Sequence, residues 1–196
     1  MSKLMISLLA AAGIAFAGAA GAANDKTMSR DAYKAEKDKI EAQYKADKDK
    51  CSGLSGNAKD VCQAEAKGHE KVAKADLEAQ YKNTDRARYE AREAKAEADY
   101  DVAKEKCDDL KGNDKDVCVK EAKAAQTKAK ADAKVARTTT NTTGTMKTSA
   151  KQAEVRKDAA EDKRSAEYKV AKEKCDAMSG DAKDKCVSNA KLKYAQ

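Results

Sequence analysis

The chain has 196 residues, a formal net charge of +7 and no proline, and 38% of its residues are charged while only 4% are aromatic. This composition argues against an ordinary globular domain, because alanine supplies much of the apolar fraction and contributes little burial per side chain. The 41 basic and 34 acidic residues nearly balance, whereas a nucleic-acid binder normally has a concentrated basic face. With alanine, lysine and glutamate prevailing, the chain favours long helices.

Residues 1–23 are typical of a cleavable secretory signal peptide. A single basic residue, Lys3, precedes an apolar run that ends at Phe16, and small residues follow as far as Ala23. A retained membrane anchor is the alternative, although the apolar run is short for a bilayer span. We therefore expect a periplasmic or secreted bacterial protein with no transmembrane span after cleavage.

The next segment predicts a helix with a narrow apolar seam. Tyr33, Ile40, Tyr44 and Cys51 follow one another at spacings of 7, 4 and 7, which places them within about 40° of one another on one helix face. Charged residues and alanine fill almost all of the positions between them. Only one side of this helix is therefore suited to packing.

A motif bounded by two cysteines ends this helix and occurs three times. The copies span residues 51–62, 107–118 and 175–186 and use all six cysteines. Each copy has ten residues between its cysteines, an apolar residue three places in, a glycine, and a Lys-Asp pair near its end. Such an internal repeat indicates one supersecondary unit used three times.

Each copy is predicted to form a tight turn between two antiparallel helices. The glycine suits a left-handed helix end, the next residue is predicted to be an N-cap, and an aspartate three residues later to be an acidic partner in the first turn. Lysines precede each motif, where the end of a helix favours positive charge. The predicted turn and cap residues are Gly56, Asn57, Asp60, Gly112, Asn113, Asp116, Gly180, Asp181 and Asp184.

One disulfide is predicted in each hairpin. The two cysteines of a copy lie symmetrically about the turn, and alanine-rich faces allow the alpha carbons to approach within disulfide range, about 5.5 to 6 Å. Six cysteines permit about fifteen pairings, and swapped or intermolecular pairing is the alternative. The predicted local pairs are Cys51 with Cys62, Cys107 with Cys118, and Cys175 with Cys186.

Two breaks divide the chain into three hairpins. Residues 83–85 are rich in helix-capping residues and are expected to separate the hairpins at 24–83 and 84–137, although one helix over 58–107 is an alternative. A threonine-rich linker is expected at 138–149, before a third hairpin at 150–196. The predicted fold is all-α: an elongated series of tandem antiparallel, coiled-coil-like helical hairpins, each stapled by one disulfide.

No catalytic, cofactor or metal site is expected. His69 is the only histidine, and it is predicted to lie opposite Tyr44 on the seam. The cysteine spacing lacks the Cys-x-x-Cys pattern of zinc and redox sites. The acidic turn at 108–116 lacks the alternating ligands and closing glutamate of a calcium loop. The protein is therefore not expected to be an enzyme.

Two alanine-rich tracts, at 90–100 and 122–134, resemble the helical stalk of TolA-like bacterial cell-envelope proteins. The resemblance is compositional and covers the helical tracts only. A TolA-like protein is a helical link across the periplasm, with a membrane anchor and a globular C-terminal domain. The resemblance thus implies a link between components of the cell envelope.

The sequence favours a non-enzymatic exported helical-repeat protein that acts as a cell-envelope spacer, scaffold or interaction module. Its expected partner is an envelope protein or an anionic envelope polymer, without specific nucleic-acid binding, and self-association is compatible with the pattern. One alternative is a periplasmic stress-related or chaperone-like binding protein. A third reading is a redox-responsive protein that exchanges its disulfides.

Overall fold

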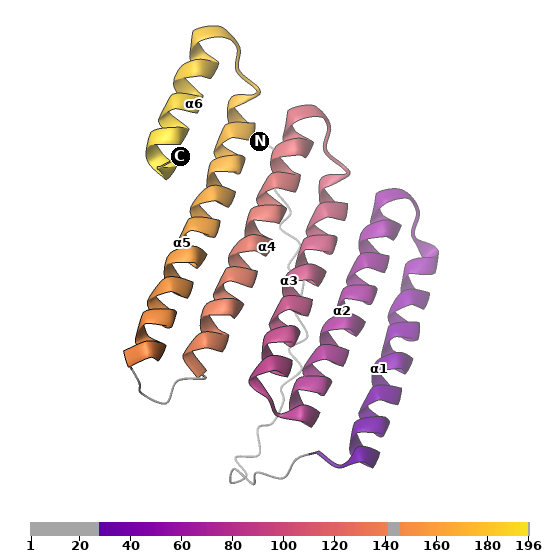
Figure 1. The fold of residues 1–196 in the computed structure, drawn as a ribbon. Coiled ribbons are helices and arrows are strands. Elements are labelled where there is room, and N and C mark those ends of the chain that lie inside the picture. Colours follow the sequence, from indigo (N-terminus) through magenta and orange to yellow (C-terminus); the bar gives the residue numbers. More distant parts are fainter. Residues whose placement is uncertain (1–27, 141–145, 196) are drawn as a thin grey trace, which may run out of the picture.

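The protein is a single layer of antiparallel helices (Figure 1). A computed structural model describes residues 28–140 and 146–195, so the predicted signal peptide at 1–23 lies outside the described residues. Within these two ranges, the backbone of each helix packs on the helices that precede and follow it in sequence. The prediction of an all-α series of antiparallel hairpins is confirmed.

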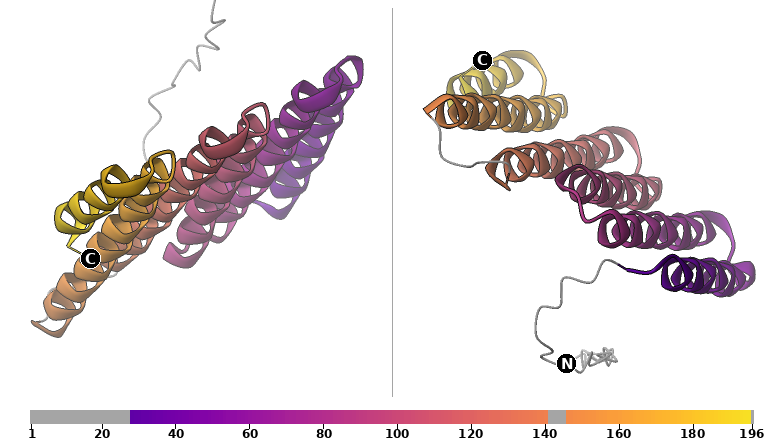
Figure 2. Two further views of the ribbon diagram at one scale, coloured as in Figure 1. Left: turned by 90° about the horizontal axis from the view of Figure 1, so that it is seen from above. Right: turned by 60° about the horizontal axis from the view of Figure 1, so that its bottom comes forward.

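Six α-helices form the layer in the described residues. The first hairpin consists of α1 (Arg30–Lys50), a short 3-10 turn η1 (Cys51–Gly53) and α2 (Gly56–Lys82). The second consists of α3 (Asp85–Cys107) and α4 (Gly112–Thr140), and the third of α5 (Met146–Cys175) and α6 (Gly180–Tyr194). Figure 2 shows that successive helices lie side by side with a stagger, which makes the array elongated and places α1 and α6 at its two ends.

The chain reverses between α2 and α3. Asn83 adopts a left-handed conformation with φ of 47°, which asparagine tolerates better than most residues. The Thr84 hydroxyl then accepts a hydrogen bond from the Ala87 N–H at 3.1 Å and caps α3. The predicted break is therefore confirmed, and a continuous helix over 58–107 is excluded.

The bounds predicted for the threonine-rich linker are wrong at both ends. Helix α4 continues to Thr140 and α5 begins at Met146, while residues 141–145 lie outside the described residues. The hydroxyls of Thr138 and Thr139 donate to the carbonyls of Lys134 and Val135 at 2.9 and 2.7 Å. Threonine within a helix commonly satisfies its hydroxyl in this way, by donating to a carbonyl of the preceding turn.

The interior of the layer is built from small side chains. Nearly all of its buried apolar residues in the described ranges are alanine or cysteine, and Leu77 is the exception. In α2, a Cβ atom placed on Gly68 would lie 3.2 Å from the Cβ of Ala98 in α3, so the two helices approach closely at this point. Alanine burial yields little free energy per residue, so this array needs further stabilisation.

The predicted seam of the first hairpin is present at its open end. The rings of Tyr33 and Tyr81 lie 4.5 Å apart between centroids. The Tyr33 hydroxyl donates to the Glu78 carboxylate at 2.8 Å, and this hydrogen bond raises the pKa of Tyr33. An aromatic pair at one end and a disulfide at the other thus hold α1 against α2.

The third hairpin is shorter on its outgoing side. Helix α6 ends at Tyr194, whereas α5 begins 29 residues before Cys175, at Met146. The first half of α5 therefore packs on α4 alone. Arg164, which replaces the apolar seam residues Ile40 and Ala96 of the other units, is exposed there.

We expect Gly56→Ala to lower the free energy of unfolding by about 1 kcal/mol, because Gly56 has φ of +56° and a left-handed conformation costs other residues about 1–2 kcal/mol. A Cβ atom would meet nothing within 4 Å at Gly56 or at Gly53. Gly53→Ala, in the same turn but without a positive φ, is the matched control. Urea denaturation followed by circular dichroism measures both, and equal effects would contradict the backbone explanation.

Candidate functional site

The three disulfide turns are the most regular feature of the molecule. The alpha carbons of the paired cysteines are 5.6, 5.7 and 5.7 Å apart in the pairs Cys51–Cys62, Cys107–Cys118 and Cys175–Cys186. All six cysteines are paired, as predicted. Each disulfide ties the end of an incoming helix to the start of the outgoing one.

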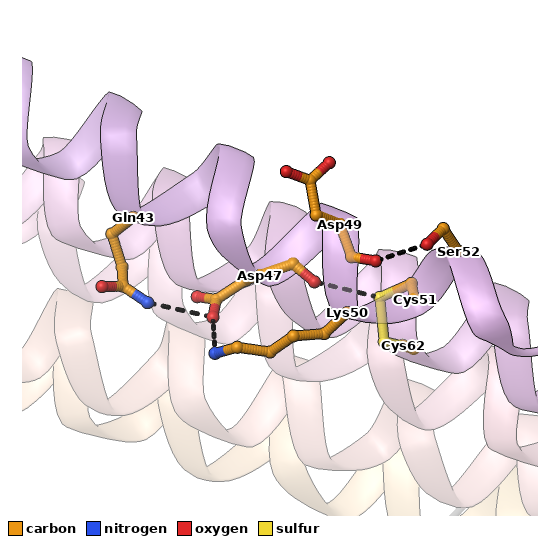
Figure 3. Close-up of a disulfide and its surroundings, with 7 residues drawn as sticks. All are labelled: Gln43, Asp47, Asp49, Lys50, Cys51, Ser52 and Cys62. Carbon is orange, nitrogen blue, oxygen red and sulfur yellow. Dashed lines mark hydrogen bonds and ion pairs between the residues drawn. A yellow bond between two sulfur atoms is a disulfide. The ribbon is translucent and has the colours of Figure 1, made fainter.

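The first turn is held by a compact polar cluster (Figure 3). The Asp47 carboxylate accepts hydrogen bonds from Lys50 Nζ at 2.7 Å and from Gln43 Nε2 at 2.9 Å, and these lower the pKa of Asp47. Cys51 Sγ lies 3.3 Å from the Asp47 carbonyl oxygen. Since a disulfide sulfur carries no hydrogen, this last contact is packing and not a hydrogen bond.

The predicted roles of the turn residues are confirmed only in part. The glycines Gly56, Gly112 and Gly180 have the left-handed conformation expected of them, but each is the first residue of the next helix. Ser55 and Ser179 therefore occupy the N-cap positions of α2 and α6, and the cap assignment of Asn57, Asn113 and Asp181 is wrong. Because the helices begin earlier than predicted, Asp60, Asp116 and Asp184 lie beyond the first turn, so their assignment is also wrong.

The asparagine after the turn glycine has another role, between hairpins. Asn113 Nδ2 donates to the backbone carbonyl of Glu173 at 3.0 Å, joining the start of α4 to the last turn of α5. Asn57 is the equivalent residue in the first turn, and its Nδ2 is buried with no hydrogen-bond partner among the described residues. The third copy has Asp181 at this position.

Ion pairs cross the second and third turns, and the sequence analysis does not predict them. Lys115 Nζ lies 2.9 Å from the Asp108 carboxylate, and Lys183 Nζ lies 2.8 Å from the Asp176 carboxylate. The hydrogen bond from each lysine lowers the pKa of its aspartate. The shared spacing of these pairs after their cysteines could have revealed them, but the first copy has Ser52 at the aspartate position.

A charged cluster at Glu97 joins three helices in the middle of the layer. The Glu97 carboxylate accepts a hydrogen bond from Lys71 of α2 at 2.6 Å and from Lys130 of α4 at 2.8 Å. These bonds, the one from Lys130 foremost, lower the pKa of Glu97 to about 2. Glu97 on α3 thus links the first hairpin to both helices of the second.

We expect Glu97→Gln to flatten the acid limb of the stability profile. The pKa of Glu97 is about 2 in the folded protein against a reference value of 4.5, so its stabilisation is present above about pH 4.5 and is lost as the pH falls toward 2. At neutral pH the loss should be about 1 kcal/mol or less, since the side chain is 40% exposed and exposed ion pairs are screened.

Urea denaturation between pH 2 and pH 7 measures this effect. Asp101→Asn removes an exposed carboxylate from the same helix and serves as the control. A Glu97→Gln variant whose stability changes with pH as steeply as that of the parent protein would contradict the assignment.

Two grooves lie at equivalent places on the layer. One lies between α2 and α3, where Val72, Ala98 and Val102 line it together with His69. The other lies between α4 and α5, and Tyr194 of α6 also lines it. His69 is exposed, and it is close enough to Asp47 of α1 to help lower the pKa of that carboxyl group. The grooves offer small apolar surfaces between charged rims.

The described part of the chain has no metal-binding cluster and no membrane-spanning helix, and it exposes several large apolar side chains. No group of three His, Cys, Asp or Glu side chains is arranged to hold a metal ion in the part of the chain that the structure describes. In that same part, none of the helices is long and apolar enough to span a membrane. Large apolar side chains are exposed at equivalent places in the three turns, at Leu54, Leu110 and Met178, and at Leu192 in α6.

Comparison with known proteins gives no relative. No protein-family model, no curated protein and no solved structure matches the chain.

Proposed function

We propose that the protein is an exported, non-enzymatic structural or interaction module of the bacterial cell envelope. The observation that carries the proposal is the pairing of all six cysteines in three local disulfides. Structural disulfides form and persist in oxidising compartments such as the periplasm. The expected signal peptide and the compositional resemblance to TolA-like envelope proteins point in the same direction.

The arrangement of the helices supports a spacer or scaffold more than a binding pocket. A single layer leaves both of its faces in solvent, and those faces carry ion pairs that run between helices, such as Lys106 with Glu65 at 2.8 Å and Lys174 with Glu121 at 2.6 Å. Units that contact only their neighbours give an extended surface whose length follows the number of repeats. Such a surface suits contacts with envelope proteins or with an anionic envelope polymer.

A chaperone-like binding protein is the second candidate. The observation in its favour is the exposure of Leu54, Leu110 and Met178, each between 41% and 46% exposed, at the same place in three successive turns. Apolar side chains displayed along one edge could hold unfolded segments of client proteins. A redox-responsive protein is a third candidate, and reversible reduction of the turn disulfides at physiological potentials would favour it.

Site-specific photocrosslinking in the envelope tests the main proposal. A benzophenone amino acid is introduced at exposed Lys39 or Lys169, with the native leader retained, and the crosslinked products are identified from whole envelopes. The proposal predicts discrete adducts with an envelope protein or with cell-wall material in unstressed cells. Adducts to many unrelated proteins that appear only after heat shock would favour the chaperone-like reading, and a cytoplasmic protein with free thiols would contradict both.

A further inference from the structure

The helix faces through which one hairpin packs on the next are repeated at the two ends of the array, where they are exposed. When the copies are aligned on their cysteines, Ala98 of α3 and Ala166 of α5 occupy the same position, and they are 5% and 8% exposed. Ala91 and Ala159 likewise match and are 6% and 3% exposed. These alanines are buried where α3 and α5 have a preceding hairpin to pack on.

Helix α1 carries the same alanines, and no described helix covers them. Ala35 and Ala42 are the equivalents of the two buried alanine positions, and both are exposed. Ala46, equivalent to Val102 of α3, is also exposed. The outer side of α1 thus has the pattern of a packing face, at the end of the layer seen in Figure 2.

The outer side of α6 is the complementary face. Leu192 corresponds in register to Gly68 of α2, which closely approaches Ala98, and to Ala124 of α4, which lines the groove against α5. No described helix follows α6, and Leu192 is 82% exposed, the highest value among the exposed large apolar side chains. An isolated exposed leucine is unremarkable, but this one lies on the face that joins hairpins elsewhere in the chain.

We propose that α6 of one copy packs on α1 of a second copy, at a wider spacing than that of α2 and α3, with Leu192 against the alanines Ala42 and Ala46. A second copy is the expected partner because this contact would repeat the interfaces between hairpins inside the chain. Helix α1 bears the same alanines that α3 and α5 pack against the second helix of the preceding hairpin. The two faces differ, so the contact is head-to-tail and continues from copy to copy. Self-association of this kind would occur wherever the protein is located.

The contact between copies is weaker than the contacts between hairpins. Helix α6 has 15 residues, against 27 in α2, so less surface is buried. Asp181 also replaces the asparagine that donates to a carbonyl of the next hairpin at Asn113, and a carboxylate has no hydrogen to donate. Assembly is therefore expected to depend strongly on protein concentration.

Sedimentation velocity of the purified, oxidised protein over a concentration series tests the proposal. Leu192→Glu and Ala42→Glu, both at exposed sites, should each weaken association at least about tenfold, as expected for the loss of a buried leucine contact or the burial of a charge. Leu54→Glu, at another exposed leucine, is the control and should change nothing.

The location of the contact is tested by a benzophenone amino acid at position 192 in a mixture of isotopically light and heavy protein. The expected crosslink joins position 192 of one copy to residues 35–46 of another. The proposal is overturned if the protein remains monomeric at millimolar concentration, if Leu54→Glu is as disruptive as Leu192→Glu, or if position 192 crosslinks elsewhere or only to a different protein.

Discussion

Replacing Cys107 and Cys118 together by serine is expected to lower the free energy of unfolding by about 3 kcal/mol, the value that the chain-entropy model gives for so short a closed loop. The two cysteines are 11 positions apart in the sequence and join α3 to α4 in the middle of the layer. The buried side chains around them are mostly alanine, so little hydrophobic burial remains to hold the hairpin. Urea denaturation at neutral pH measures the loss.

The same pair of substitutions at Cys175 and Cys186 is the matched comparison. That disulfide has the same sequence separation, but its hairpin lies at the end of the array and has a single neighbour. We expect a similar loss of stability there, confined to unfolding of α5 and α6. A loss below about 1 kcal/mol in both variants would show that helix packing alone sustains the array and would contradict the role given to the disulfides.

Gly68→Leu is expected to lower the free energy of unfolding by about 1–3 kcal/mol, the usual range for overpacking. A Cβ atom alone would lie 3.2 Å from the Ala98 Cβ, so the larger side chain must force α2 and α3 apart. The higher helix propensity of leucine offsets only part of this cost, by less than about 1 kcal/mol.

Two further variants make the prediction specific. Gln80→Leu introduces the same side chain at an exposed position of α2 and should leave stability nearly unchanged. Adding Ala98→Gly to Gly68→Leu should recover part of the loss, because it removes the atom that the new side chain meets. A double variant whose effects are simply additive would contradict the close approach of the two helices.

The part of the fold that can be predicted from the sequence is the part that lies within the repeat unit. Two cysteines at a fixed spacing, a glycine with a left-handed conformation and lysines in the preceding turn all follow from local geometry, and they recur in three copies. The disulfide pairing and the hairpins could therefore be predicted, as could the break at Asn83 and Thr84.

The remainder depends on contacts between units that sequence patterns do not specify. Alanine occurs on nearly every side of these helices, so its positions do not reveal which face of α2 packs on α3. The same holds for the cluster of Lys71, Glu97 and Lys130, because lysine and glutamate are abundant throughout. The sequence around Asn113 favours a helix cap because asparagine often caps helices, whereas its partner, the Glu173 carbonyl, lies 60 residues away in sequence.

The most direct test of the account is the state of the six cysteines in protein isolated without reductant from cells that produce the full chain. Free thiols are blocked with one alkylating reagent before reduction and the newly released thiols with a second, and disulfide-linked peptides are identified by mass spectrometry. The account predicts no free thiols and three linkages, Cys51 to Cys62, Cys107 to Cys118, and Cys175 to Cys186. Free thiols, or linkages between different hairpins, would contradict it.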